Sequence, residues 1–123
     1  MRIFKSRSFH RFATSEGISD SALIDAVARA EQGLIDADLG GEVIKQRIAR
    51  PGQGRSGGYR TIILFRRGAK AFFEYGFSKS RRANLNDIEE AEFKQAAKRV
   101  LALSENHLAE LLKRGEFVEV RIK

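Results

Sequence analysis

The chain of 123 residues is 42% hydrophobic and 32% charged and has no cysteine, which is typical of a single globular domain, residues 1–123, and excludes a disulfide framework or a thiolate nucleophile. The two histidines are isolated from each other, so we expect no structural zinc and no other cofactor. The longest apolar run has four residues (62–65), and the N-terminus has no apolar signal segment. We therefore expect no membrane span and a cytoplasmic location. The net charge is +7, and residues 45–82 hold the whole excess, with eleven basic residues against one acidic, which indicates a polyanionic partner.

The first 41 residues predict a short strand followed by two helices. Ile3-Phe4 favours the strand, and residues 8–15 favour a helix that Gly17 ends. A second helix, 19–34, begins with the capping residues Ser19 and Asp20. Its apolar side chains recur at helical spacing: Leu23, Val27, Ala30 and Leu34. Gly40-Gly41 then indicates a turn.

The centre of the chain predicts a meander of three antiparallel strands. The first strand covers 43–50 and ends at Pro51, which has no N–H to donate. Residues 51–58 contain four glycines and predict a loop. Strands over 59–66 and 69–77 follow, separated by a turn at Arg67-Gly68.

Two further helices and a short strand are predicted near the C-terminus. Asn86 and Glu89 have the spacing of a capping box, so a helix begins there. Its expected apolar stripe is Ile88, Ala91, Ala97, Val100 and Leu101. Ser104 caps a shorter helix that ends at Gly115, and 117–120 either adds an edge strand or packs alone.

Three groups of basic residues in the meander can contact phosphate. Lys45 and Arg47 are two apart and share one face of a strand, and Arg60 shares a face with apolar neighbours. Arg60 can equally lie at a strand end with its stem packed on the sheet. The glycine-rich loop lacks the Gly-Lys-Ser/Thr of a nucleotide-binding loop, so it is either a basic loop that orders on nucleic acid or a plain connection. Residues 78–82 carry basic and hydroxyl side chains, and they either contact phosphate or form a solvated turn.

General acid–base chemistry has few candidates in the basic block. The block contains no histidine and only one carboxylate, Glu74, which favours an ion-pair role over catalysis. His10 and His107 are expected to have surface or packing roles. Cleavage of RNA would therefore depend on Lys and Arg stabilising the phosphorane, with a lysine or tyrosine moving protons.

The residues from Val43 to Thr61 and from Ala71 to Asn84 resemble the RelE/HigB-type toxins of bacterial type II toxin–antitoxin systems, in the RelE/ParE superfamily. The similarity runs from Phe4-Lys5 through 35–41 to Glu119-Val120. It implies an α+β fold, in which N-terminal helices pack on one face of a small, mostly antiparallel sheet and C-terminal helices follow.

The resemblance also implies a function: messenger-RNA cleavage at the ribosome with the RNA 2′-hydroxyl as nucleophile, no metal or cofactor, and inhibition by an antitoxin, often a helix-turn-helix DNA-binding protein. On this basis the expected catalytic residues are Lys45, Arg47, Arg60, Lys79, Arg82 and Tyr59, and the expected RNA-binding residues are Arg50, Arg55 and Arg81.

The chain departs from the resemblance at one position. Ribosome-dependent relatives carry a tyrosine or histidine near the C-terminus as proton carrier, and here only His107 follows Arg82. Tyr59, Tyr75 or Lys79 can take that role. Because the superfamily also contains gyrase poisons, a non-catalytic toxin or an RNA-binding module remains the alternative.

Overall fold

A computed structural model describes the backbone of residues 1–50 and 54–122, and their side chains except at 54–57. In chain order its elements are β1 (Arg2–Ser6), α1 (Arg7–Glu16), α2 (Asp20–Glu31), β2 (Ala37–Gly40), β3 (Val43–Arg50), β4 (Gly54–Arg66), β5 (Lys70–Ser78), α3 (Asp87–Val100), α4 (Glu105–Lys113) and β6 (Phe117–Val120).

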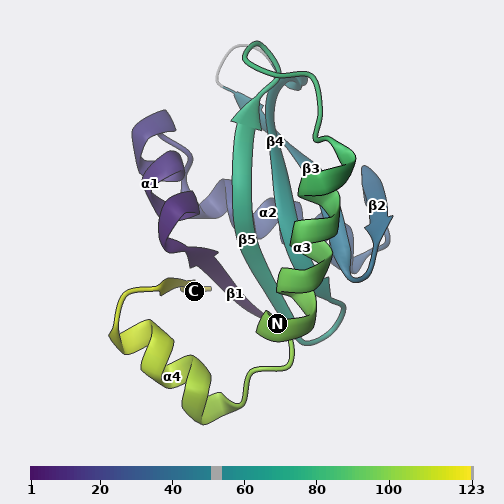
Figure 1. Ribbon diagram of the computed structural model, residues 1–123. Helices are drawn as coiled ribbons and strands as arrows, with labels where there is room; N and C mark the ends of the chain where they lie inside the picture. Colours follow the sequence, from purple (N-terminus) through teal and green to yellow (C-terminus); the bar gives the residue numbers. More distant parts are fainter. Residues whose placement is uncertain (51–53, 123) are drawn as a thin grey trace.

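The strands form one sheet in the order β2-β3-β4-β5-β1-β6. β1 runs parallel to β5, and the other pairs are antiparallel. In Figure 1, α2 lies behind the sheet, α1 stands beside β1 and β5, and α3 crosses in front of the sheet. The fold is therefore α+β, as predicted.

Two apolar cores lie on opposite faces of the sheet. One joins the sheet to α1 and α2 and includes Phe9, Leu23 and Phe73, and the other joins it to α3 and α4 and includes Phe4, Phe72 and Leu108. Residues alternate between the cores along each strand because side chains of a strand point to opposite faces in turn. In β4, for example, Ile62 belongs to the second core and Ile63 to the first.

Side chains cap the helices where the sequence predicts caps. The hydroxyl of Ser19 accepts from Ala22 N at the start of α2. Asn86 and Glu89 form a complete capping box at the start of α3. The predicted bounds of α2 were wrong at its end: the helix stops at Glu31, and Leu34 is 59% exposed rather than on the apolar stripe.

Three further predictions differ from the structure. β2 was not predicted, because four residues with an aspartate and a glycine carry no strand pattern. β4 begins at Gly54, inside the predicted loop, because Arg50 pairs with it across the strands; residues 51–53 lie outside the described part. The predicted apolar stripe of α3 is wrong at Ile88, which is 72% exposed, and at Ala91, which is also exposed; Phe93 packs against the core instead.

Within the described residues, no helix is both long enough and apolar enough to cross a bilayer.

Candidate functional site

Two rows of side chains cross the sheet on the face that α3 covers. In the first row Lys45 of β3 pairs with Ile62 of β4, which pairs with Tyr75 of β5. In the second row, two residues further along β3, Arg47 pairs with Arg60, which pairs with Phe77. Residues paired in register share a face, so the three predicted cations lie together.

The two arginines of the second row face each other directly. Like charges opposite each other on adjacent strands destabilise a sheet. Burial lowers the pKa of the Arg60 guanidinium, the charge of Arg47 acts in the same direction, and the charge of Asp36 opposes both. An arginine nevertheless stays protonated in a protein. This pair therefore concentrates positive charge, and the carboxylate of Asp36 offsets part of the repulsion.

A pocket of about 220 Å³ opens beside these arginines and is lined by Asp36, Ala37, Lys45, Arg47 and Arg60. The carboxylate of Asp36 accepts from the backbone N–H of Arg47 at 2.7 Å and from its Nη2 at 3.3 Å. Arg29 fixes the same strand by donating to the Arg47 carbonyl at 2.8 Å. Asp36 itself is held by the buried side chain of Gln46, whose Oε1 accepts from the Asp36 N–H at 2.7 Å. The pocket thus holds three cations and one carboxylate that orients Arg47.

A second network lies at the other end of the rows, around Arg82. Its guanidinium donates to the Tyr75 hydroxyl at 3.2 Å, to Glu89 at 2.9 Å and to the Asn84 carbonyl at 3.0 Å. These bonds to Glu89 and Tyr75 raise the pKa of Arg82. Lys45 Nζ donates to Asn84 Oδ1 at 2.9 Å, so Asn84 links the first row to Arg82.

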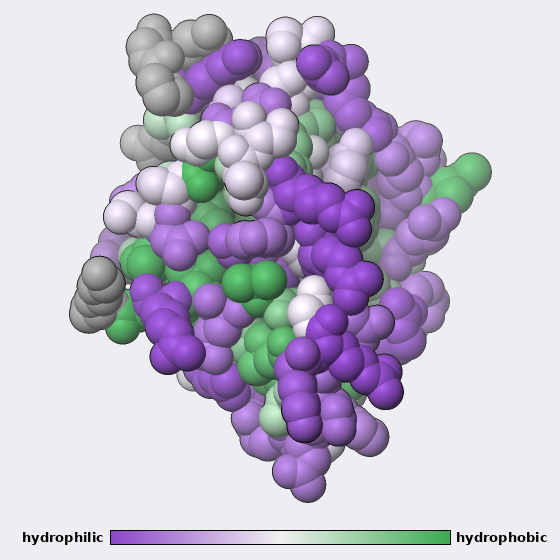
Figure 2. All heavy atoms as spheres, turned by 90° about the vertical axis from the view of Figure 1, so that its left-hand side faces the viewer, coloured by the Kyte–Doolittle hydropathy of each residue, from purple (hydrophilic) through white to green (hydrophobic). Residues whose placement is uncertain are grey.

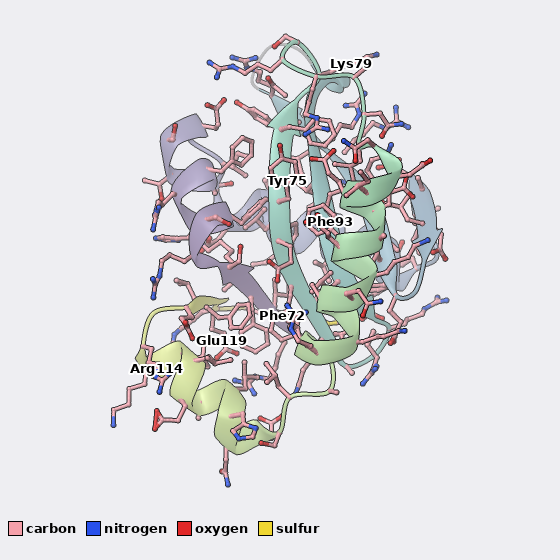
Figure 3. The ribbon with its side chains drawn as sticks, in the orientation of Figure 1. Phe72, Tyr75, Lys79, Phe93, Arg114 and Glu119 are labelled. Atoms are coloured by element: carbon pink, nitrogen blue, oxygen red, sulfur yellow. The ribbon has the colours of Figure 1, made fainter. Side chains whose placement is uncertain are left out.

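Tyr75 is held by aromatic contacts as well as by Arg82. Its ring stacks on Phe93 of α3 with centroids 5.9 Å apart, and it lies 5.8 Å from Phe77. Figure 3 shows Tyr75 beside Phe93, between the sheet and α3. The Arg82 guanidinium lies over the rings of both Tyr75 and Phe77. The phenol is therefore fixed at the edge of the cationic face.

Other predicted residues lie elsewhere. Tyr59 is 3% exposed in the core under α1, where its hydroxyl donates to the Glu16 carbonyl, and burial raises its pKa. Arg50 lies over the Tyr59 ring at 5.6 Å. Lys79 and Arg81 are exposed in the turn after β5, Lys79 at the far end of the sheet (Figure 3). The side chain of Arg55 is outside the described part.

The structure therefore brings together Lys45, Arg47, Arg60 and Arg82, but not Tyr59 or Arg50. The sequence did not predict three polar residues of the site: Asp36, Asn84 and Glu89. Glu89 was assigned only to the capping box, although the same carboxylate binds Arg82. Asp36 precedes the unpredicted strand β2, so no pattern placed it beside Arg47.

The histidines lie outside this site. His107 is exposed in α4, and His10 is in α1, where its Nδ1 is buried without a hydrogen bond among the described residues. Over the same described residues, no group of three or more His, Asp or Glu side chains could hold a metal ion.

Comparison with known proteins identifies the family. No curated protein gives a significant match to the chain. A family model described as the RelE toxin of the RelE/RelB toxin-antitoxin system matches residues 1–120. That match covers nearly the whole chain, and the family pairs each toxin with a cognate antitoxin. The α+β fold and the matched residues together place the chain in the RelE toxin family of toxin–antitoxin systems.

Proposed function

We propose that this toxin is a metal-independent endoribonuclease that cleaves messenger RNA at the ribosome and so inhibits translation. One observation carries the proposal: Arg47 and Arg60 oppose each other across the strands, with Lys45 two residues away and a pocket between them. Such an arrangement concentrates positive charge at one place on the sheet, where charge-assisted hydrogen bonds can bind a phosphate anion.

Lys45, Arg47 and Arg60 would bind the scissile phosphate and stabilise its transition state. The RNA 2′-hydroxyl attacks phosphorus, the 2′-oxygen–phosphorus bond forms, and the bond to the 5′-oxygen breaks. Negative charge builds up on the phosphoryl oxygens in between, and fixed cations in a partly desolvated pocket stabilise it most. Asp36 would act as a positioning residue, because it binds both the backbone and the side chain of Arg47.

Two protons must move in this reaction, one from the 2′-hydroxyl and one to the 5′-oxygen. Tyr75 is the phenol on the cationic face, and Arg82 donates to its hydroxyl. The Arg82 guanidinium and the rings of Phe93 and Phe77 hold this phenol at the edge of the cationic face, where its hydroxyl can exchange protons with the RNA. We therefore assign proton transfer to Tyr75 rather than to Tyr59, whose hydroxyl is on the opposite side of the sheet.

The antitoxin partner is proposed to be a helix-turn-helix DNA-binding protein, as the resemblance to HigB-type toxins implies. Such a protein would be encoded next to the toxin. A small adjacent reading frame with two helices at helix-turn-helix spacing, whose product neutralises the toxin, supports this assignment. An adjacent inhibitor of another fold contradicts it.

Expression of the toxin alone from a tightly repressed promoter tests the proposal. Wild type should arrest growth, and sequencing of RNA ends should show in-frame cuts within translated codons. Lys45→Ala and Arg60→Ala should relieve the arrest and remove the cuts. Arg114→Ala is the control, because Arg114 is an exposed cation at the C-cap of α4, distant from the rows (Figure 3).

Circular dichroism of the purified variants separates a lost site from a lost fold. Arg60→Ala should keep the far-UV spectrum and the cooperative melting of wild type, because Arg60 lines a surface pocket and belongs to neither apolar core. Growth arrest with intact messages and damaged DNA would instead identify a gyrase poison. A harmless wild type, or fully toxic Lys45→Ala and Arg60→Ala variants, would refute the nuclease proposal.

A further inference from the structure

A second pocket, of about 330 Å³, lies at the edge of β5 next to the cationic rows. We call it the edge pocket. Its walls come from the end of α1, from β5 and from the turn after β5: Phe12, Ser15, Glu16, Gly76, Ser78 and Arg81. Tyr75, Phe77 and Arg82 border both this pocket and the cationic face. The two sites are therefore continuous.

The edge pocket exists because β1 is shorter than β5. The pairing between them ends at Lys5 and Phe73, and within the described residues β4 is then the only strand that pairs with the rest of β5. α1 follows β1 directly and places Phe12 against the strand at Gly76. A Cβ at position 76 would overlap the Phe12 ring, so glycine is needed here. Figure 2 views this side of the molecule, where the surface is mainly hydrophilic with apolar side chains between.

The walls of the pocket combine three kinds of group that recognise an RNA base. Phe12 supplies aromatic surface, and Arg82 lies over the buried Phe77 ring with Cζ 5.5 Å from its centroid, which leaves the other side of the guanidinium plane for a base. Unpaired bases stack on aromatic rings and on guanidinium planes. Arg81 adds positive charge for the backbone, and Glu16 adds a carboxylate. Pockets that bind small ligands begin at about 300 Å³, so a single base fits.

The distance to the phosphate site also fits one nucleotide. Phe77 is the register partner of Arg60, so the backbone of the pocket wall lies one strand spacing, ~4.8 Å, from the backbone of the arginine that would bind the scissile phosphate. A ribose spans a gap of this size between a phosphate and its base.

We propose that the edge pocket binds the nucleobase next to the scissile phosphate and that Glu16 selects guanine. A carboxylate accepts two parallel hydrogen bonds, and on its Watson–Crick edge guanine presents two neighbouring donors, N1–H and the N2 amino group. Adenine and cytosine place an acceptor nitrogen next to their one amino group, which repels a carboxylate. The inference rests on the proposed nuclease function and adds a base preference to it.

Mapping of RNA ends for wild type and Glu16→Gln tests the proposal. Wild type should cut about 10-fold or more faster where guanine occupies one fixed position beside the cut, since a bidentate base contact discriminates on this scale. Glu16→Gln should lose that preference and favour adenine, whose edge an amide matches, while the rate at other sites stays. Glu110→Gln, an exposed acid-to-amide change in α4, is the matched control.

A wild type that makes no cuts would overturn the nuclease function but not the base pocket. A binding measurement then tests the pocket by itself. Guanosine 5′-monophosphate should shift the NMR signals of the Phe12 and Phe77 rings, adenosine 5′-monophosphate should do so more weakly, and Glu16→Gln should remove the difference. An unchanged base preference in Glu16→Gln would overturn the proposal. So would a wild type that responds to neither nucleotide together with a Glu16→Gln variant that binds the antitoxin more weakly, because this result would assign the pocket to a partner peptide.

Discussion

Tyr75 and Tyr59 are the two tyrosines of the chain, and the sheet separates them. Tyr75→Phe keeps the ring that stacks on Phe93 and removes only the hydroxyl to which Arg82 donates. If the phenol moves protons, single-turnover cleavage should fall by about 10²-fold or more, with RNA affinity unchanged. Tyr59→Phe is the matched control: it should cleave at the wild-type rate and lose about 1 kcal/mol of stability with its hydrogen bond to Glu16. Equal rates for Tyr75→Phe and wild type would contradict the assignment.

Glu74 is a partly buried carboxylate near Ser6 and Arg99, at the irregular position of β5 opposite Ile62 and Ile63. Burial raises the pKa of its carboxyl more than the charge of Arg99 and the Ser6 hydroxyl lower it. The folded protein therefore holds this proton to higher pH than the unfolded chain does, so stability is lost as the pH rises through the folded pKa. Glu74→Gln should raise the melting temperature at pH 7 by a few degrees.

The melting temperature that Glu74→Gln gains over wild type should depend on pH, and this dependence is the measurement that tests the explanation. The gain should vanish near pH 4 and below, where the carboxyl is protonated in both states. Glu92→Gln, at an exposed position of α3, should change the melting temperature little at either pH. A Glu74→Gln protein that melts below wild type at pH 7 would show that the carboxylate stabilises the fold through Arg99.

At the scale of elements, the sequence predicted those helices and strands whose signals lie within their own residues. Caps and apolar spacing predicted α1, α2, α3 and α4, and strand-forming residues bounded by turn residues predicted β3, β4 and β5. β2 depends instead on a contact distant in sequence: the buried Gln46 side chain binds the Asp36 N–H and the Ala26 carbonyl, and so fixes the start of an otherwise irregular segment. No pattern within residues 37–40 carries that information.

The candidate site likewise contains residues that the sequence could group and residues that only the tertiary fold brings in. Alternation predicted that Lys45 and Arg47 share a face, and register then brings Arg60 beside them. Asn84 and Glu89 join the site only because the chain turns back after β5 and α3 lies across the sheet, so their bonds to Lys45 and Arg82 depend on the tertiary fold. Tyr59 and Tyr75 could be distinguished only once the faces of β4 and β5 were known.

At the scale of the whole molecule, the fold divides the basic block of residues 45–82 into two ends. At the end where β4 turns into β5, acids from outside the block neutralise its cations: Arg66 binds Glu42 at 2.9 Å and Lys70 binds Glu105 at 2.8 Å. At the opposite end, Lys45, Arg47 and Arg60 share a pocket in which Asp36 pairs with Arg47, and Glu89 pairs with Arg82 nearby. The exposed Lys79 and Arg81 follow at the same end, so most cations of the block lie there.

This division predicts how salt should affect RNA binding. Each phosphate contact to a single strand adds about −0.7 to the slope of log K against log salt, because binding releases counterions. Lys45→Gln with Arg47→Gln should make that slope shallower by about 1.4, measured by fluorescence anisotropy with a single-stranded RNA between 50 and 400 mM salt, a range chosen around physiological ionic strength. Arg66→Gln with Lys70→Gln removes the same charge from the same sheet and should leave the slope nearly unchanged, because those side chains lie at the other end of the sheet, away from the pocket of Lys45, Arg47 and Arg60. Equal losses of slope in the two double variants would mean that RNA responds to net charge alone, and the face formed by the two rows would then have no special role in binding.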